Sequence, residues 1–203
     1  IPSYYISREA KKHVTVVLNG DGADELFGGY RRYVPAANGW LKILSKLGFL
    51  GSILPVKNNH RSTLNYLQRM LNLSTKTGLD FYNSATNNIF EDVYHFENNQ
   101  TFLNMNQQIL DVNCKDISEL SKLLLLDFYF IFPSDLLKKM DIATMANSLE
   151  ARSPFLSKKM LELAPTLCDK FKISGTNTKV ILKELANRYL PKVIINQPKR
   201  GFE

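Results

Sequence analysis

The sequence predicts a mainly α-helical protein with one or a few parallel β-strands. A β-branched apolar run, "HVTVVLN" from His13 to Asn19, is typical of a strand that is buried on both faces. Most of the later segments instead place apolar residues at helical spacing. A parallel strand needs neighbours, and one candidate strand does not supply them, so we expect only part of a sheet.

A helix is expected in "RSTLNYLQRMLN", where Leu64, Leu67 and Leu71 fall on one stripe. Residues 78–113 are polar, rich in asparagine and interrupted by aromatic residues. We expect short helices and loops there.

The next segment, "LSKLLLLDFYFIF", is apolar nearly all round and is predicted to be a core helix. Asp116 and Glu119 have the spacing of a capping pair at its start. Pro133 is expected to end it, and Ser134 to cap a new helix in "DLLKKMDIATMANSL".

Two further helices complete the pattern. "KKMLELAPTL" predicts a short helix, and "TKVILKELANRYL" predicts a last amphipathic helix with Thr176 or Asn177 as its cap and Pro191 at its end. Met140, Met145 and Leu149 have the spacing of core residues. Glu150 and Arg152 are expected to hold the turn before Pro154.

Composition narrows the classes of function. The 203 residues carry 26 Lys and Arg against 19 Asp and Glu, and this net charge of +7 favours polyanionic partners such as nucleotide phosphates. The basic residues form no five-residue block, which argues against a nucleic-acid partner. The sequence has neither an apolar run long enough for a membrane span nor a signal peptide. Its two cysteines lack metal-binding spacing, so we expect a reducing, cytoplasmic setting.

The acidic loop after the strand, "NGDGADELFGGY", admits two interpretations from its residues alone. Asp21 could cap a helix with Asp24 three residues later. Alternatively, Asp21, Asp24 and Glu25 crowd like charges that Mg²⁺ and a phosphate would offset, with Gly20 and Gly22 allowing close approach. The common phosphate-loop patterns are absent.

Basic residues elsewhere are equally ambiguous. Lys179 lies near the start of a predicted helix, where a bound phosphate would resolve its conflict with the helix dipole, but a solvated side chain is the commoner case. Asp135 and Lys139 are four residues apart and share a helix face, which by itself predicts only an exposed ion pair.

Three ordered blocks resemble the synthetase domain of the glutamine-hydrolysing asparagine synthetase family. "LNGDGADELFGGYRRY" resembles the family's SG(E/D)G(A/S)DE(L/V)FGGY segment. "DLLKKMDIATMANSLEARSPFL" is similar to its LL.(K/R).D..SMA.SLEAR.PFLD segment, and "KISGTNTKVILKELANRYLPKVIINQPKRGF" to its K..LK......LP..I..R.K.GF ending.

The resemblance implies part of an α/β domain of the adenine-nucleotide α-hydrolase-like (ATP pyrophosphatase) type. It implies ATP and Mg²⁺ as cofactors, and ATP-dependent adenylation of aspartate followed by amidation with ammonia from glutamine. A homodimer is among the expected assemblies. The implied site residues fall into four groups: catalytic Asp21, Lys179 and Tyr30; ATP- or pyrophosphate-binding Gly20, Gly22 and Lys179; metal-binding Asp21 and Asp24; and substrate-binding Asp135, Lys138, Lys139 and Asp141. For Tyr30, simple packing is the alternative.

The sequence also departs from the family pattern. It contains no SGG.DS ATP-gripping loop and no N-terminal glutaminase domain, whose nucleophile neither Cys114 nor Cys168 can be. It begins with Ile1 and stops just past "KRGF". We therefore expect the C-terminal portion of a synthetase domain that is inactive alone, with the strand, acidic loop and helix in 1–33, an insertion in 34–115 and the remaining blocks in 116–203. The missing N-terminal half would be its partner.

Two alternatives remain open at this point. One is a related amide-forming ligase of the surface-polysaccharide amidotransferase, β-lactam synthetase or lasso-peptide cyclase type. The other is a non-catalytic binding module that keeps the fold.

Overall fold

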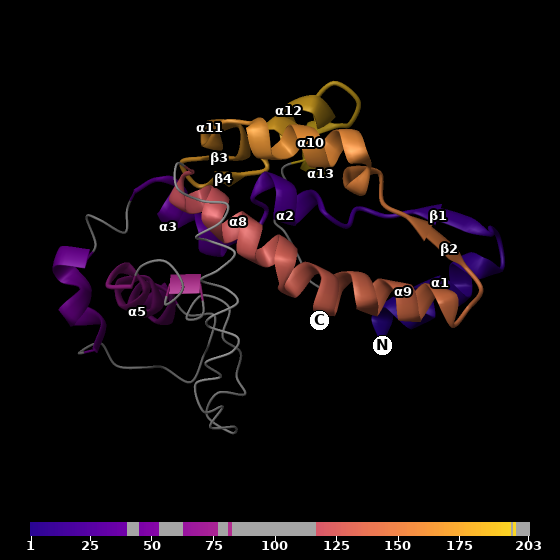
Figure 1. Ribbon diagram of the computed structural model, residues 1–203, viewed down its shortest axis with the longest axis horizontal. Helices are drawn as coiled ribbons and strands as arrows, with labels where there is room; N and C mark the ends of the chain where they lie inside the picture. Colours follow the sequence, from indigo (N-terminus) through magenta and orange to yellow (C-terminus); the bar gives the residue numbers. More distant parts are fainter. Residues whose placement is uncertain (40–44, 53–62, 77–80, 83–116, 196, 198–203) are drawn as a thin grey trace. The chain divides into compact units, whose positions relative to one another are not determined.

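The computed structural model describes residues 1–39, 45–52, 63–76, 81–82, 117–195 and 197. These residues form two compact units, one from 1–30 and 127–203 and the other from 31–126. Most described residues outside loops are helical, and the strands are few and short (Figure 1). The predicted class, mainly α with few strands, is confirmed.

The first unit contains a two-stranded parallel sheet. Strand β1 (Val16–Leu18) pairs with β2 (Glu150–Arg152), with Leu18 opposite Arg152. The predicted strand is thus confirmed, but its burial on both faces is wrong, because Leu18 is 73% exposed. The described part of the chain gives β1 only one partner strand, so little covers its side chains.

Two helices lie next to this sheet. Helix α1 (Pro2–Lys11) packs against α9 (Lys138–Met145), close to β1 and β2 (Figure 1). Lys11 Nζ donates to the carbonyl of Ser148 at 2.7 Å, which ties α1 to the turn after α9. Met145, predicted as core, is 60% exposed, whereas Leu149 is buried as expected.

The core of this unit forms around helix α2 (Ala23–Phe27). Leu26 and Phe27 are buried with Ala164 of α10 (Lys158–Thr166), and α12 (Val180–Ala186) also packs against α2 (Figure 1). Complete burial of a phenylalanine contributes about 1.5–3 kcal/mol. This packing fixes the acidic loop that precedes α2. The short elements around this core are η5 (Pro154–Leu156), α11 (Asp169–Lys172), the hairpin β3 (Ile173–Ser174) and β4 (Asn177–Thr178), and α13 (Lys192–Ile195).

Pro133 does not end the core helix, contrary to the prediction. Helix α8 (Glu119–Tyr129) is followed by a π-helical segment, η4 (Phe132–Leu137), which leads directly into α9. A proline lacks the N–H of the ordinary turn and clashes with the carbonyl four residues earlier, and a wider turn accommodates both defects. Ser134 caps no helix, because its hydroxyl donates to the carbonyl of Phe130. At the start of α8 the hydroxyl of Ser118 accepts the N–H of Ser121 at 3.1 Å, and Asp116 lies outside the described residues.

The predicted last helix begins and ends elsewhere. Asn177, one of the expected caps, belongs to strand β4, and the residue that precedes α12 is Lys179. α12 ends at Ala186, before Pro191, and α13 follows that proline. Glu150 and Arg152 belong to β2 rather than to a turn, although Arg152 Nε does donate to Glu150 Oε1 at 2.6 Å.

The described elements of the second unit are helical. They are η1 (Arg31–Tyr33), α3 (Val34–Ala37), η2 (Ser45–Ser52), α5 (Thr63–Ser74) and the part of α8 up to Leu126. The helix predicted at residues 61–72 is confirmed by α5. Its predicted stripe is wrong, since Leu71 is buried but Leu64 and Leu67 are 38% and 45% exposed. Of residues 78–113 only Phe81 and Tyr82 are described, so the loops expected there lie outside the described residues. Among the helices that the structure describes, none has the length and apolar character of a membrane span.

Candidate functional site

The acidic loop connects the end of β1 to α2. Gly22 is the residue that precedes α2 and has a left-handed conformation with φ of 91°. A Cβ atom there would lie 2.6 Å from Cδ2 of Leu156, so both backbone and packing require glycine. Asp21 is therefore not the helix cap. A Cβ at Gly20 would meet nothing within 4 Å, which leaves open space on that side of the loop.

Asp21 lies half-buried at the turn of the loop, where its Oδ2 accepts a hydrogen bond from Asn19 Nδ2 at 2.8 Å. Burial raises the pKa of Asp21, and the nearby carboxylate of Glu25 raises it further. The ammonium of Lys139 on α9 acts in the opposite direction. Lys139 itself is exposed, and among the described residues no hydrogen bond or ion pair joins it to Asp21, so its charge acts on this carboxylate through space.

An ion pair joins the first block to the third. Lys179 Nζ lies 3.0 Å from Asp24 Oδ1, and the two side chains are 30% and 24% exposed. Lys179 has a left-handed backbone with φ of 52°, a conformation that costs a non-glycine residue about 1 kcal/mol or more. The conflict between this lysine and the start of its helix is resolved here by the Asp24 carboxylate.

Glu25 is buried and accepts a hydrogen bond from the Tyr30 hydroxyl at 2.5 Å. The Tyr30 hydroxyl is a neutral donor, so the negative charge of Glu25 continues to act on Asp21.

Three predicted substrate-binding residues are not brought to this loop by any described contact. Asp135, Lys138 and Asp141 are exposed. Among the described residues, no hydrogen bond or ion pair connects these three side chains to Asp21 or Asp24, and none joins Asp135 to Lys139. Lys138 and Asp141 lie on α9 together with Lys139, whose effect on Asp21 is described above, and Asp135 lies in the preceding segment η4.

The donor set is suited to Mg²⁺ held jointly with a substrate. The described residues contain no cluster of three or more His, Cys, Asp or Glu side chains arranged for a metal. Mg²⁺, however, commonly takes one or two carboxylates and completes its shell with water and phosphate oxygens. Asp21, half-buried beside a second carboxylate, has the unbalanced negative charge that a cation would offset.

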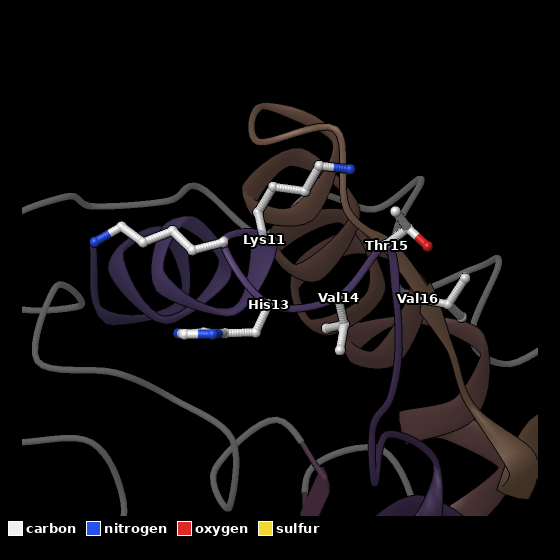
Figure 2. A pocket seen from close by; sticks show the side chains of 6 residues that line it. Lys11, His13, Val14, Thr15 and Val16 are labelled. Atoms are coloured by element: carbon white, nitrogen blue, oxygen red, sulfur yellow. The ribbon is translucent and has the colours of Figure 1, made fainter.

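A recess of about 560 Å³ lies at the opposite end of β1 and is lined by residues 11–16 (Figure 2). Its side chains splay apart in Figure 2 and do not converge on one point. The two lysines are already engaged, Lys11 with the Ser148 carbonyl and Lys12 with Glu9 at 2.7 Å. The acidic loop is therefore the stronger candidate site.

The residues missed from the sequence are Asn19 and Ser153. Asn19 holds Asp21, and the Ser153 hydroxyl donates to Asn19 Oδ1. Both residues directly follow the paired strands, and their equivalent positions become visible only from the pairing of β1 with β2, which no local sequence pattern reports.

Comparisons with known proteins agree with this arrangement of blocks. The family described as "Asparagine synthase" matches residues 1–203. "Asparagine synthetase [glutamine-hydrolyzing] 1" of Bacillus subtilis is 31% identical over 219 residues, which cover 100% of this chain and 32% of that protein. The "Putative asparagine synthetase [glutamine-hydrolyzing]" of Mycobacterium tuberculosis is 31% identical over 212 residues, covering 100% of this chain and 31% of that protein.

The chain thus spans about a third of the length of these curated relatives. No solved structure matches the chain. The family match over all 203 residues, together with identity above 30% along the whole chain, establishes the relationship. The chain belongs to the asparagine synthase family.

Proposed function

We propose that this chain forms the carboxylate and lysine side of an ATP-dependent carboxylate–amine ligase site, which converts aspartate to asparagine. The observation that supports this proposal most strongly is the Asp24–Lys179 ion pair at 3.0 Å, which joins the first and third blocks of the sequence. The effect of Lys139 on Asp21 adds the second block. Acidic and basic groups that converge in this way suit a substrate that carries both phosphates and a carboxylate.

The proposed reaction has two steps. A carboxylate oxygen of aspartate attacks the α-phosphorus of ATP, and the bond to pyrophosphate breaks. Ammonia derived from glutamine then attacks the activated carbonyl carbon, AMP leaves with the carboxylate oxygen, and the nitrogen loses a proton. Each step moves negative charge between oxygen atoms, so positioned cations lower its barrier.

Each residue has a proposed role in this scheme. Lys179 holds charge on the adenylate and the departing pyrophosphate, and Asp21 accepts the proton that the attacking nitrogen loses. The raised pKa of Asp21 suits that task. Tyr30 holds Glu25. The open side of the loop at Gly20 receives the phosphates, and Gly22, packed against Leu156, provides the left-handed turn that shapes the loop for them.

Mg²⁺ would be held by Asp21 and Asp24, and it would neutralise phosphate charge. Lys139 would orient the carboxylate of the acceptor. Asp135, Lys138 and Asp141, which lie on the same helical segment, would bind the remainder of that substrate.

We further propose that turnover requires the ATP-gripping SGG.DS loop, which these 203 residues do not contain. A glutaminase region like that named by the "glutamine-hydrolyzing" relatives would supply the ammonia. On this proposal the chain alone binds pyrophosphate but does not form AMP. Aspartate-dependent exchange of pyrophosphate into ATP by the chain alone would contradict this part.

The test measures binding of magnesium pyrophosphate to the chain by calorimetry. Asp24→Asn and Lys179→Met are expected to lose binding, whereas Lys158→Met keeps it, because Lys158 forms only an exposed surface pair with Glu162 at 3.8 Å. If Lys158→Met weakens binding as much as Lys179→Met does, attraction is nonspecific and the proposed site is wrong.

A further inference from the structure

The ends of the two parallel strands place two polar side chains side by side. β1 ends at Leu18 and β2 at Arg152, which are opposite each other in register. The backbone pairing continues one residue further, because the Asn19 N–H donates to the carbonyl of Arg152 at 2.9 Å. Asn19 and Ser153 therefore occupy matching positions just past the sheet.

Both the oxygen and the nitrogen of the Asn19 side-chain amide form hydrogen bonds. Its Oδ1 accepts the hydroxyl proton of Ser153, and its Nδ2 donates to Asp21 Oδ2 at 2.8 Å. The amide has only one orientation that satisfies both neighbours, because a flipped amide would turn its oxygen toward the carboxylate. A continuous chain of hydrogen bonds thus runs from the end of β2 to Asp21.

This chain of bonds constrains the most exposed part of the acidic loop. Gly20, between Asn19 and Asp21, is exposed, and its carbonyl accepts the Ala23 N–H at 3.3 Å, a contact that holds the loop backbone but does not orient the Asp21 carboxylate. In the described part of the chain, the Asn19 amide is the only hydrogen-bond donor to the Asp21 carboxylate. It leaves Oδ1 of Asp21 available for another group.

We propose that Asn19 is a positioning residue, whose amide is anchored by Ser153 and fixes the Asp21 carboxylate for the reaction. The inference rests on the proposed function, because it takes Asp21 to be the group that meets the cation and substrate. The matching family segment begins with serine where this chain has Asn19. A serine has one side-chain oxygen for both contacts and is shorter by one bond, so this chain orients Asp21 by a different device.

The experiment uses Mn²⁺ as a probe for the cation at Asp21, with its dissociation constant measured by electron paramagnetic resonance. Asn19→Ala is expected to weaken Mn²⁺ binding roughly tenfold, the effect typical of losing a partner that orients a metal ligand. Ser153→Ala weakens it in the same direction. The double variant binds no worse than Asn19→Ala, because both residues act through one chain of bonds.

Asn19→Ser is the milder variant if Asn19→Ala does not fold, and it should fall between Asn19→Ala and the unchanged protein. Asn147→Ala is the matched control, because the Asn147 amide also donates twice, to the Ala143 carbonyl at 2.9 Å and to the Tyr4 carbonyl at 3.4 Å. It is expected to leave Mn²⁺ binding unchanged. Equal binding by Asn19→Ser and the unchanged protein, or additive effects of Asn19→Ala and Ser153→Ala, would overturn the proposal.

A second readout separates this inference from the proposed function. The side-chain amide protons of Asn19 give their own signals in a ¹H–¹⁵N spectrum, and these should shift on Asp21→Asn and on Ser153→Ala. If these signals shift while the unchanged protein binds no Mn²⁺, the chain of hydrogen bonds from Ser153 to Asp21 is supported and the proposed cation site is wrong. If they respond to neither substitution, the positioning role of Asn19 is wrong whatever Mn²⁺ does.

Discussion

Replacing Gly29 with alanine tests whether the close packing of residue 29 against Asp24 holds the Asp24–Lys179 ion pair in place. A Cβ atom at residue 29 would overlap Oδ1 of Asp24 and lie 2.5 Å from its Cγ and 2.9 Å from its Cα. The carboxylate could rotate away, but the Cα belongs to α2, so the helix itself must shift. Gly29 does not have positive φ, so the effect is steric and does not come from backbone strain.

The expected loss follows from two contributions. Forcing an extra carbon into a packed site typically costs about 1–3 kcal/mol. The ion pair is 24% and 30% exposed and therefore screened, so breaking it adds less than about 1 kcal/mol. We expect Gly29→Ala to lower the free energy of unfolding by about 1–4 kcal/mol in total.

Urea denaturation followed by far-ultraviolet circular dichroism measures this loss. Gly20→Ala is the matched control for stability, because a Cβ there meets nothing within 4 Å. In an Asp24→Ala background the cost of Gly29→Ala should fall, since the overlapping carboxylate is gone. A Gly29→Ala protein that unfolds at the unchanged midpoint, or a cost that is the same in both backgrounds, would refute the reasoning.

Three further predictions concern ionisable groups. Burial and a neighbouring carboxylate raise the pKa of Asp21, so ionisation of Asp21 weakens the fold as pH rises through that pKa. Asp21→Asn should therefore raise the free energy of unfolding at about pH 7 but not at about pH 3. An equal gain at both pH values would contradict this prediction. Burial raises the pKa of Tyr82 to about 12. The contribution of Tyr82 to the free energy of unfolding is complete below about pH 10 and falls by about 2–3 kcal/mol as pH rises toward 12. Tyr82→Phe should remove that fall, as measured by urea titrations at several pH values. Burial lowers the pKa of Lys172, so its charged form weakens the fold at neutral pH; Lys172→Met should stabilise the protein in thermal melts, whereas Lys170→Met, at an exposed position of α11, should not.

The elements that sequence reasoning found are those with a long local pattern. The β-branched run before the acidic loop contains β1, and the periodic segments contain α5 and α10. Strands β2, β3 and β4 were missed, because two or three residues show no periodicity. β2 is defined by its pairing with β1, over a hundred positions earlier in the chain, and no local pattern reports that pairing.

The candidate site divides in the same way. The residue types of the loop, and the resemblance of its sequence, were sufficient to select Asp21, Asp24 and Lys179. The ion pair between Asp24 and Lys179 was not predictable, because it depends on a left-handed backbone at Lys179 and on the packing of α12 against α2. Asn19 was missed for a related reason: at the end of an apolar run an asparagine indicates the end of a strand, and only the register with β2 gives it partners.

The π-helical segment η4 contains Pro133, which was predicted to end the helix and instead affects the orientation of a residue near the site. Each residue of an α-helix turns by about 100°, so closing the wider turn into a regular one would rotate the residues that follow by about that angle. Lys139 comes two residues after the segment ends, and it acts on Asp21 in its present orientation. Pro133→Ala restores the missing N–H and removes the ring, which favours the regular turn.

We therefore expect Pro133→Ala to turn Lys139 away and to raise the pKa of Asp21 further, as followed by the carboxyl carbon shift in a pH titration. Lys139→Met should raise that pKa in the unchanged protein, because it removes the same positive charge. In the Pro133→Ala background it should have little further effect. If Lys139→Met raises the pKa equally in both backgrounds, the π-turn does not set the orientation of Lys139, and the contacts of α9 with α1 hold it instead.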